Sequence, residues 1–508
     1  SFYLQALERH HTDTNRAIAW NHLGNAYQTL DRLGEAAHAY RQSIQLDPAP
    51  AWPYHNLAVV LTTQKKYDEA IPAYQDAVER HDTPEERAGG LENLGVVLTR
   101  QKRYDDAIAV YIEALEISPR QDVIWTSLGY SYAAQDDTER AILSYREAIT
   151  YDDTAAAPWR GLGQVHQMRN EIDEAVEAYE TAIQLDPVNP WPYHYLALLY
   201  SQGKTVLKPT TLDTASRYYQ EAIERHEDTA VKVALLYHWG TLYQTNDLPD
   251  EALTAYRRAA AIDNTHAATW YQIASLSLTT HRLDDAWDAY QRVIELESKS
   301  PWPYHYLGLI AKRREEYGLS RSYFQQALQR HQPSPDAAIT WYHLGGVYHR
   351  INEFKLARAA YRQATRLNDT LVQPWRGLGD LHAELREYDE AGEAYHTALK
   401  IDPTYAPVHN SLGLLYEQAG DDTRAMQSYQ QAVESTSLPH DRAIAYNSLG
   451  DIYRRQQREK DAILAYQQAT ELDPDYPWPY YNLGAIYDSQ GATPQALELY
   501  AQARKKRP

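Results

Sequence analysis

The stretch WNHLGNAYQTLDRLGEAAHAYRQSIQLDP, residues 20–48, decides the fold because two different helical patterns follow one another in it. The first part, WNHLGNAY, spaces Trp, Leu-Gly and Tyr as i, i+3, i+4 and i+7, which is the apolar stripe of an amphipathic helix. The second part places Ala36 and Tyr40 four residues apart, on one face of a second helix. Pro48 ends that helix, because proline cannot continue it and the residue before a proline resists helical geometry. The stretch therefore predicts a pair of helices.

The Leu-Gly word recurs through the whole chain, sometimes with alanine in place of glycine. Nine of the thirteen gaps between its small residues are 34 residues long, three are 37 and one is 43. Twelve residues after nearly every small residue comes alanine, and four further comes tyrosine, with Phe324 the only substitute. The small residue permits close approach of the paired helix, and the aromatic ring fills the gap between neighbours. The small residues are Gly24, Ala58, Gly95, Gly129, Gly163, Ala197, Gly240, Ala274, Gly308, Gly345, Gly379, Gly413, Gly450 and Gly484.

With this period and these anchor residues the chain resembles the tetratricopeptide repeat family over essentially all of its 508 residues. The resemblance implies an all-α fold, an α-α superhelix in which stacked helix pairs line a concave groove mainly with their first helices. We expect about fourteen helix-turn-helix repeats forming a continuous solenoid over residues 17–508, and the second helix of a truncated repeat over residues 1–16. Each repeat buries its apolar face only against its neighbours, so no single globular core is expected.

Several repeats depart from the 34-residue period. Four second helices are predicted to carry an extension of three residues, close to one helical turn. Their endings are ERHHTDTN from Glu8, ERHDTPEER from Glu79, QRHQPSPD from Gln329 and ESTSLPHD from Glu434. The repeat that begins at Trp191 has an enlarged segment between its helices, at about 201–213. We interpret its QGKT sequence as a surface loop, because Leu198 stands where a phosphate-binding loop needs a second glycine.

Composition narrows the classes of partner. The formal net charge is -20, which argues against nucleic acid and favours a basic or neutral protein or peptide. The chain has no cysteine, so disulfides and thiolate metal sites are excluded. No apolar run approaches the ~20 residues of a membrane span, and the N-terminus is not a signal peptide. We expect a cytoplasmic protein, without membrane contact, that is a fragment of a longer polypeptide with domains upstream.

The word WPYH occurs at Trp52, Trp191 and Trp302, and WPYY occurs at Trp478. We interpret WPY as architecture: Pro is tolerated in the first helical turn, Tyr takes the core position, and Trp packs back from just outside the helix as a hydrophobic staple. The histidines His55, His194 and His305 lie three residues before the small residue, a position that in the family faces the groove. They are either solvated or locally bonded, or they are donors to a ligand with a pH-dependent contact.

Other polar residues occupy the same family offsets. Arg160 and Arg376 occur in two similar motifs, PWRGLGQVH and PWRGLGDLH. Either arginine could bind a ligand carboxylate through two hydrogen bonds, or could form an ion pair with a neighbouring acidic side chain. Asparagines can bond a peptide backbone through both donor and acceptor, but here their ladder is broken in the middle repeats. Chaperone-binding members of the family hold a C-terminal carboxylate with a cationic clamp. We do not expect this clamp here, because Asn21 and Gly89 stand where it needs lysines. The candidate groove residues are Asn21, Asn25, His55, Asn56, Asn93, Arg160, Gln164, His194, Tyr237, Tyr271, His305, Tyr342, Arg376, Asp380, Asn410, Asn447 and Asn482.

These patterns predict an interaction scaffold that binds a protein or peptide in its groove. The alternative is the sensor or recruiting arm of a larger enzyme, such as a signal-transduction ATPase of the apoptosis and innate-immunity type or a glycosyltransferase, with the catalytic part outside this chain. No HExxH, GxSxG or paired-carboxylate arrangement stands out, so we predict no catalysis, cofactor or metal. The adjacent histidines at 10 and 11 diverge on a helix.

Overall fold

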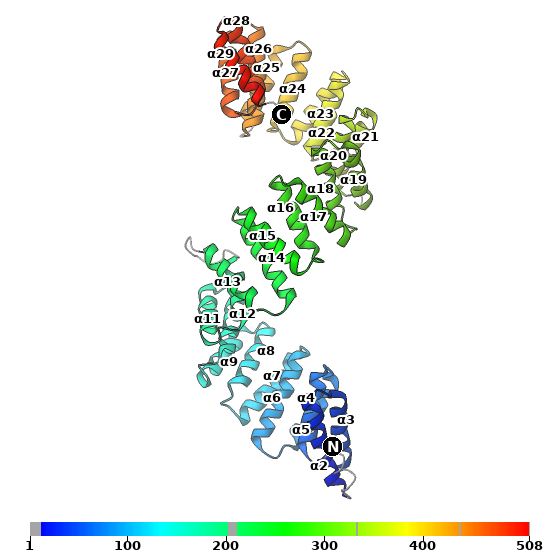
Figure 1. Ribbon diagram of the computed structural model, residues 1–508, viewed down its shortest axis with the longest axis vertical. Coiled ribbons are helices and arrows are strands. Elements are labelled where there is room, and N and C mark those ends of the chain that lie inside the picture. The colour runs from blue at the N-terminus through cyan, green and yellow to red at the C-terminus, as the bar shows by residue number, and fades with distance from the viewer. Residues whose placement is uncertain (1–11, 202–210, 332–333, 436–437, 507–508) are drawn as a thin grey trace. The chain divides into compact units, whose positions relative to one another are not determined.

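The computed structural model describes residues 12–201, 211–331, 334–435 and 438–506, and within these ranges it contains 28 α-helices and no β-strand (Figure 1). The chain divides into two compact units, Ser1–Asn264 and Thr265–Pro508. The helices of the first unit are α2 (Asp13–Thr29), α3 (Leu33–Leu46), α4 (Ala51–Thr63), α5 (Tyr67–Arg80), α6 (Pro84–Arg100), α7 (Tyr104–Ile117), α8 (Asp122–Ala134), α9 (Thr138–Tyr151), α10 (Ala156–Met168), α11 (Ile172–Leu185), α12 (Pro190–Ser201), α13 (Thr211–Arg225), α14 (Thr229–Thr245) and α15 (Pro249–Ile262).

The second unit is built in the same way. Its helices are α16 (Ala267–Thr279), α17 (Leu283–Leu296), α18 (Trp302–Arg313), α19 (Tyr317–Arg330), α20 (Ala337–Arg350), α21 (Phe354–Leu367), α22 (Val372–Glu384), α23 (Tyr388–Ile401), α24 (Ala406–Gln418), α25 (Asp422–Ser435), α26 (Pro439–Arg455), α27 (Glu459–Leu472), α28 (Pro477–Ser489) and α29 (Thr493–Lys505). In both units each even-numbered helix pairs with the odd-numbered helix that follows it. The all-α fold and the helix-pair repeats predicted from the period are confirmed.

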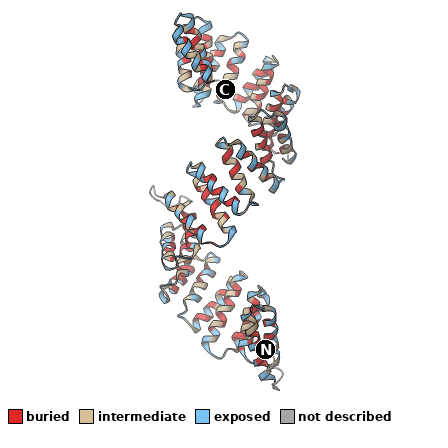
Figure 2. Ribbon diagram, viewed as in Figure 1, coloured by how far each residue is buried: buried red, intermediate tan, exposed pale blue. Residues whose placement is uncertain are grey.

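Each pair is closed by the aromatic ring of its second helix lying on the small residue of its first. A Cβ added to Gly95 would lie 2.4 Å from Cε1 of Tyr111, which is 1% exposed. The same contact joins Gly308 to Phe324 at 2.8 Å, measured to ring atom Cδ1. Figure 2 shows buried residues on the inner sides of paired helices in both units. The core is thus a row of local contacts, as expected for a repeat protein.

Replacing Gly129 with leucine is expected to lower the free energy of unfolding by roughly 1–3 kcal/mol through overpacking. An added Cβ would already lie 2.8 Å from Cε1 of Tyr145, a buried ring with no room to retreat. Gly34→Leu is the matched control, because a Cβ added to Gly34 has no heavy atom within 4 Å. Urea denaturation compares the two variants. A Gly129→Leu variant as stable as the control would show that this glycine does not lie at a tight contact.

The turn inside a repeat contains a left-handed residue, which the sequence patterns did not identify. Among the residues that the structure describes, positive φ angles occur at eleven non-glycine residues, such as Lys65 (φ 60°), and at Gly420 and Gly491. At Asp31 the turn lets the amides of residues 31 and 32 donate to Gln28 O at 3.0 Å and Tyr27 O at 2.9 Å. These bonds satisfy carbonyl groups that the end of the helix would otherwise leave unpaired.

The three-residue extensions lie in the first helices, which corrects the prediction that second helices are lengthened. Helix α5 has 14 residues and stops at Arg80, while α6 has 17. His81 adopts an extended backbone (φ -65°, ψ 128°) that ends α5. Thr83 then caps α6, its side chain accepting the amide of Glu86 at 3.2 Å, and Pro84 opens the helix. A strong N-terminal cap followed by proline favours starting a new helix over prolonging the old one.

Two other irregular repeats agree with this reading, and a third does not. Helices α14 and α26 also have 17 residues, whereas α20 has 14. Helix α2 begins at Asp13 with Thr12 as its cap, so the boundary predicted after residue 16 is four residues too late. Residues 1–11 and 202–210, which carry the rest of the partial-repeat and enlarged-loop predictions, lie outside the described residues.

Candidate ligand groove

The tryptophan of WPYH lies inside the first helical turn, not before it as predicted. Trp302 is the first residue of α18, and α4 and α12 begin one residue before Trp52 and Trp191. Trp52 is 49% exposed, so it does not act as a buried staple. The tyrosine that follows does take the core position, as Tyr54 is 9% exposed.

In three repeats the WPYH word contacts an Arg-His pair that ends the second helix of the same repeat. The guanidinium of Arg80 lies 4.5 Å from the ring of Tyr54, and its Nε donates to Pro48 O at 3.1 Å. Arg225 repeats both contacts with Tyr193 at 4.6 Å and Pro187 O at 2.9 Å. The third copy joins Arg330 to Tyr304 at 3.8 Å and to Ser298 O at 2.8 Å. The WPYH motif, at the start of the repeat, is therefore connected by these contacts to the Arg-His pair at its end.

The histidines of the two motifs add ring contacts to this connection. The ring of His81 lies 5.3 Å from Trp52 and 5.7 Å from His55. His226 contacts Trp191 at 4.9 Å and His194 at 5.6 Å. We call these groups, with Trp302, His305 and His331 as the third, the Trp-His clusters. All three WPYH histidines are packed against other rings, but only His305 is hydrogen-bonded through Nδ1, while Nδ1 of His55 and of His194 is buried without a partner among the described residues.

Burial lowers the pKa of the three WPYH histidines, His55, His194 and His305. It lowers the pKa of His194 to about 4, helped by the nearby His226 and His238. Burial, with His331 close by, lowers the pKa of His305 to about 4 as well. His305 is 3% exposed, and its Nδ1 lies 2.8 Å from Thr340 Oγ1, so it is closed to a ligand. Neutral imidazoles at these positions cannot supply a fixed positive charge to a partner.

The first helices carry the other candidates on one side, which we call the first-helix face. It consists of the residues three before, two before, one after and four after each small residue. Within units, α8 contacts α10, α12 contacts α14 and α20 contacts α22, so this face continues from repeat to repeat. The hydroxyl of Tyr40 lies 2.8 Å from Asn25 Oδ1, which also accepts from Asn56 Nδ2 at 3.2 Å. These asparagines thus bond one another and the core tyrosine.

The same arrangement recurs near the end of the second unit. Asp451 Oδ1 accepts from the hydroxyl of Tyr466 at 2.7 Å and from Asn482 Nδ2 at 3.2 Å. Asn482 also donates to Asn447 Oδ1 at 3.0 Å. Burial raises the pKa of Asp451. These polar candidates on the first-helix face are therefore already hydrogen-bonded to neighbouring residues of the chain.

The remaining candidates divide by their contacts. Asn93 Nδ2 donates to Gly89 O at 3.0 Å, and Asn410 Nδ2 donates to Asp441 O at 3.1 Å. Asn21 Oδ1 is buried without a partner in the described part of the chain. The rings of Tyr237, Tyr271 and Tyr342 pack on the core rings of Tyr256 at 5.7 Å, Tyr290 at 5.9 Å and Tyr361 at 6.1 Å.

The two arginines of the PWRG words differ in their surroundings. Arg376 Nε lies 3.4 Å from Asp380 Oδ2, and that carboxylate also accepts from Tyr395 at 2.7 Å. At the position of Asp380 the other word has Gln164, whose Nε2 donates to the hydroxyl of Tyr195 at 2.7 Å. Arg160 is partly buried and forms no ion pair with any described residue. One arginine is neutralised and the other is not.

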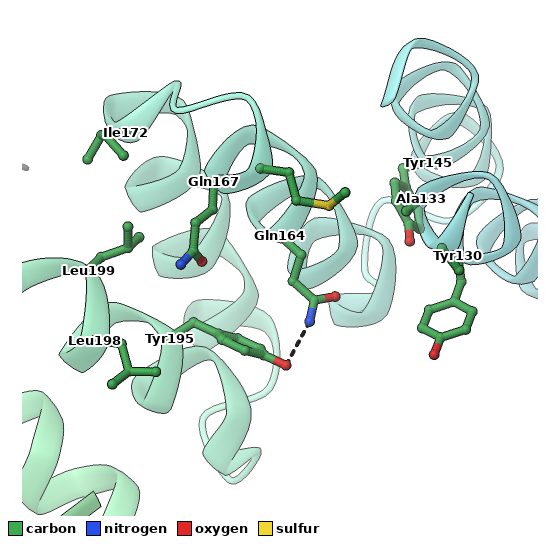
Figure 3. A pocket seen from close by; sticks show the side chains of 11 residues that line it. Tyr130, Ala133, Tyr145, Gln164, Gln167, Ile172, Tyr195, Leu198 and Leu199 are labelled. Carbon is green, nitrogen blue, oxygen red and sulfur yellow. Dashed lines mark hydrogen bonds between the residues drawn. The ribbon is translucent and has the colours of Figure 1, made fainter. Parts of the chain in front are cut away.

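A pocket of about 540 Å³ opens on the first-helix face of the first unit, and Gln164, one helical turn after Arg160, lines it (Figure 3). Figure 3 shows Gln164 and Tyr195 joined by their hydrogen bond, with Tyr130 and Tyr145 from the neighbouring repeat. Tyr130 and Met168 are each 50% exposed. The lining residues are Tyr130, Ala133, Ala134, Tyr145, Gln164, Gln167, Met168, Ile172, Tyr195, Leu198 and Leu199. The pocket offers apolar surface with a few amide and phenol groups, the usual make-up of a ligand site.

Sequence reasoning selected Gln164 from this pocket but missed Tyr130, Leu198 and Met168. The signal for two of them was present: Tyr130 and Leu198 directly follow their small residues, as Asn25, Gln164 and Asp380 do. Reading that offset for apolar as well as polar residues would have found them. Met168 ends α10 and has no such marker.

The described residues lack two other kinds of feature, a metal-binding cluster and a membrane-spanning helix. No group of three or more His, Asp or Glu side chains there is placed to hold a metal ion. No helix among them is both long and apolar enough to cross a lipid bilayer.

Comparison with known proteins identifies the family. Matches described as "TPR repeat" cover residues 168–203, 379–420 and 450–491. Matches described as "Tetratricopeptide repeat" cover residues 17–50, 56–122, 123–154, 299–369 and 406–437. Together they extend over most of the chain and over both units.

Individual proteins are similar at a low level. The chain is 25% identical over 167 residues to the general transcriptional corepressor ssn6 of Schizosaccharomyces pombe, and 26% identical over 132 residues to the general transcriptional corepressor trfA of Dictyostelium discoideum. These stretches cover 33% and 26% of this chain, but only 14% and 9% of the two relatives. The crystal structure of the APC/C hetero-tetramer Cut9-Hcn1 is similar over 100% of this chain and 95% of its own, with 15% identity and a TM-score of 0.40. From the repeat matches along its length, the chain belongs to the tetratricopeptide repeat family.

Proposed function

We propose that this chain is a non-catalytic scaffold that binds an extended peptide segment of another protein along its first-helix face. The observation that carries the proposal is the pocket between α8, α10 and α12, where Tyr130 and Met168 are half exposed beside the amide of Gln164. An exposed apolar surface with convergent polar groups favours binding. Repeat proteins present such surfaces over several repeats, so that modest contacts add up.

A selection from a displayed library of random peptides tests the proposal. We expect the purified chain to retain peptides, and Tyr130→Ala together with Leu198→Ala to reduce their binding. Ile112→Ala with Leu143→Ala is the matched control, because both residues are exposed on second helices, 41% and 61%, and do not line the pocket. Failure to enrich any peptide sequence above background would contradict the proposal.

Association with such a peptide is expected to depend on salt. A protein of net charge -20 attracts a basic or neutral segment in preference to an acidic one. The Debye length falls from about 10 Å at 0.1 M salt to about 3 Å at 1 M, so this attraction weakens. Stopped-flow association rates with a selected peptide of positive net charge should fall as sodium chloride is raised. A rate that does not change with salt would remove long-range charge from the proposal.

A second candidate keeps the same binding face but places it in a larger protein. Here the chain is the sensor or recruiting arm of a multidomain enzyme, such as a signal-transduction ATPase or a glycosyltransferase. The observation in its favour is that the matched stretches make up small parts of both curated relatives, so arrays of this type occur within longer chains. Reading the full gene tests it: an upstream nucleotide-binding or glycosyltransferase domain is expected, and its absence would leave the scaffold alone.

A further inference from the structure

Arg160, which forms no ion pair with any described residue, lies one helical turn from the lining of the pocket. Arg160 lies on α10 one helical turn before Gln164, which lines the pocket, so the two side chains project from the same side of the helix. Its positive charge acts on three core or lining phenols, opposing the effect of burial on the pKa of Tyr145, Tyr179 and Tyr195. Burial raises the pKa of all three, so their hydroxyls stay neutral and cannot balance the guanidinium.

The other PWRG word shows what a compensated arginine looks like in the same position. Arg376 has Asp380 four residues later, at 3.4 Å, while Arg160 has Gln164 at that place. The two words are otherwise alike, down to Gly161 and Gly377, where an added Cβ would meet Tyr145 at 2.3 Å and Tyr361 at 2.7 Å. The chain thus supplies a carboxylate to one arginine and withholds it from the other. A partly buried guanidinium without an anion gains most from a ligand that brings one.

We propose that Arg160 binds the side-chain carboxylate of an Asp or Glu residue in an extended peptide, whose adjacent apolar side chain enters the pocket between Tyr130, Met168 and Leu198. The proposal rests on the proposed function, because it names the residue that a bound peptide presents at this pocket. A planar guanidinium holds a carboxylate through two parallel hydrogen bonds, which also fixes the register of the peptide. An acidic side chain is favoured over a chain terminus because the first-helix face continues on both sides, from α8 to α12, so the peptide runs through.

The acidic residue is compatible with a partner of basic or neutral net charge. Long-range attraction depends on the sum of charges over a Debye length, about 10 Å at 0.1 M salt. The contact at Arg160 depends on one group within hydrogen-bonding distance. The expected ligand is therefore a segment with little or positive net charge and a single acidic residue beside an apolar one.

The test uses peptides selected on the wild-type chain, each synthesised with an acetylated N-terminus and an amidated C-terminus. We expect the selected sequences to share an Asp or Glu next to an apolar residue. Arg160→Gln should weaken binding by about tenfold or more, as should changing the peptide acid to its amide. The two changes together should cause no further loss, because they remove the same contact. Arg160→Glu should recover binding to a peptide that carries Lys in place of the acid.

Arg146→Gln is the matched control, since it makes the same change of charge on an exposed residue of α9 in the same unit. Thermal denaturation of each variant shows that it is folded. The proposal is overturned if Arg160→Gln binds as tightly as Arg146→Gln. It is also overturned if the selected peptides lack an acidic residue, which would leave the scaffold function standing. Peptides that lose binding on amidation would assign the site to a chain terminus, and selection of no peptide at all would remove both proposals.

A second measurement locates the ligand without any mutation. The chain has two methionines: Met168 lines the pocket, and Met426 lies on α25 in the other unit. In protein labelled with carbon-13 at the methionine methyl groups, a selected peptide should shift the Met168 signal and leave that of Met426 in place. A shift of Met426 alone would place the ligand elsewhere and contradict the assignment.

Discussion

Replacing Phe324 with alanine is expected to lower the free energy of unfolding of the second unit by about 3–5 kcal/mol, the usual cost of removing a buried aromatic side chain. Phe324 is 0% exposed and lies on Gly308, so the cavity forms where the two helices of the repeat touch. Its ring also contacts His305 at 5.6 Å and His343 at 6.0 Å, which joins this repeat to the next. The variant loses contacts both within and between repeats.

Phe354→Ala is the matched control, because this phenylalanine at the start of α21 is only partly buried and should cost less. Hydrogen exchange then shows where the damage lies. Stability in a repeat protein is a sum of nearest-neighbour terms, so α18 to α21 should lose protection first while the first unit stays unchanged. Equal unfolding free energies for the two variants, or uniform loss of protection in both units, would contradict this account of the core.

Lowering the pH from 7.5 to 5 is expected to destabilise the second unit by about 2 kcal/mol through His305 alone. Burial holds the pKa of His305 at about 4, below the ordinary value of 6.5, so folding favours the neutral ring. A depressed histidine pKa contributes stability that is full above 6.5 and is lost as the pH falls toward 4. Each pH unit within this window costs about 1.4 kcal/mol, which gives the estimate at pH 5.

Groups around His305 act in the same direction. His331 lies close by, and His343, whose pKa is lowered to about 3 by burial with His305 and Lys312 nearby, also resists protonation. Urea unfolding at pH 7.5, 6 and 5 measures the loss, at pH values where most carboxylates remain ionised. His305→Gln removes one titrating ring and should reduce the slope of the profile between pH 6.5 and 5, leaving the part that His343 contributes. Parallel profiles for this variant and the wild type would show that His305 is not the titrating group.

The structure also explains why phenylalanine replaces tyrosine at position 324. In several other repeats the core hydroxyl bonds to a residue one or four after the small residue, as Tyr179 does with Gln167 at 3.0 Å, whereas the hydroxyls of Tyr219 and Tyr290 are buried without a partner among the described residues. In the repeat of Phe324 these positions are Leu309 and Lys312, and neither side chain accepts a hydrogen bond. Leaving the hydroxyl out avoids burying a donor with no acceptor. The substitution was visible in the sequence, but its reason required the partner positions.

Sequence reasoning failed where two plausible assignments shared the same residues. The words ERHDTPEER and WPYH were both noticed, yet the extension was given to the wrong helix and the contact between Arg80 and Tyr54 was not foreseen. The left-handed turn residues were missed because most are not glycine, Lys65 among them. The strength of a helix cap and the tertiary contacts decide where a helix ends and which side chains meet. The spacing of residues in the sequence contains neither kind of information.

The amino-acid sequence by itself determined the family, the helix pairs and the contact of Gly with Tyr, because a repeat packs only against its neighbours and its period is written along the chain. Only the tertiary structure decided which polar residues are occupied. The words around Arg160 and Arg376 differ by little in sequence, yet Asp380 neutralises one guanidinium and Gln164 turns to Tyr195 beside the other. Whether a charge has a partner depends on distances between side chains of different helices, and those distances exist only in the folded molecule.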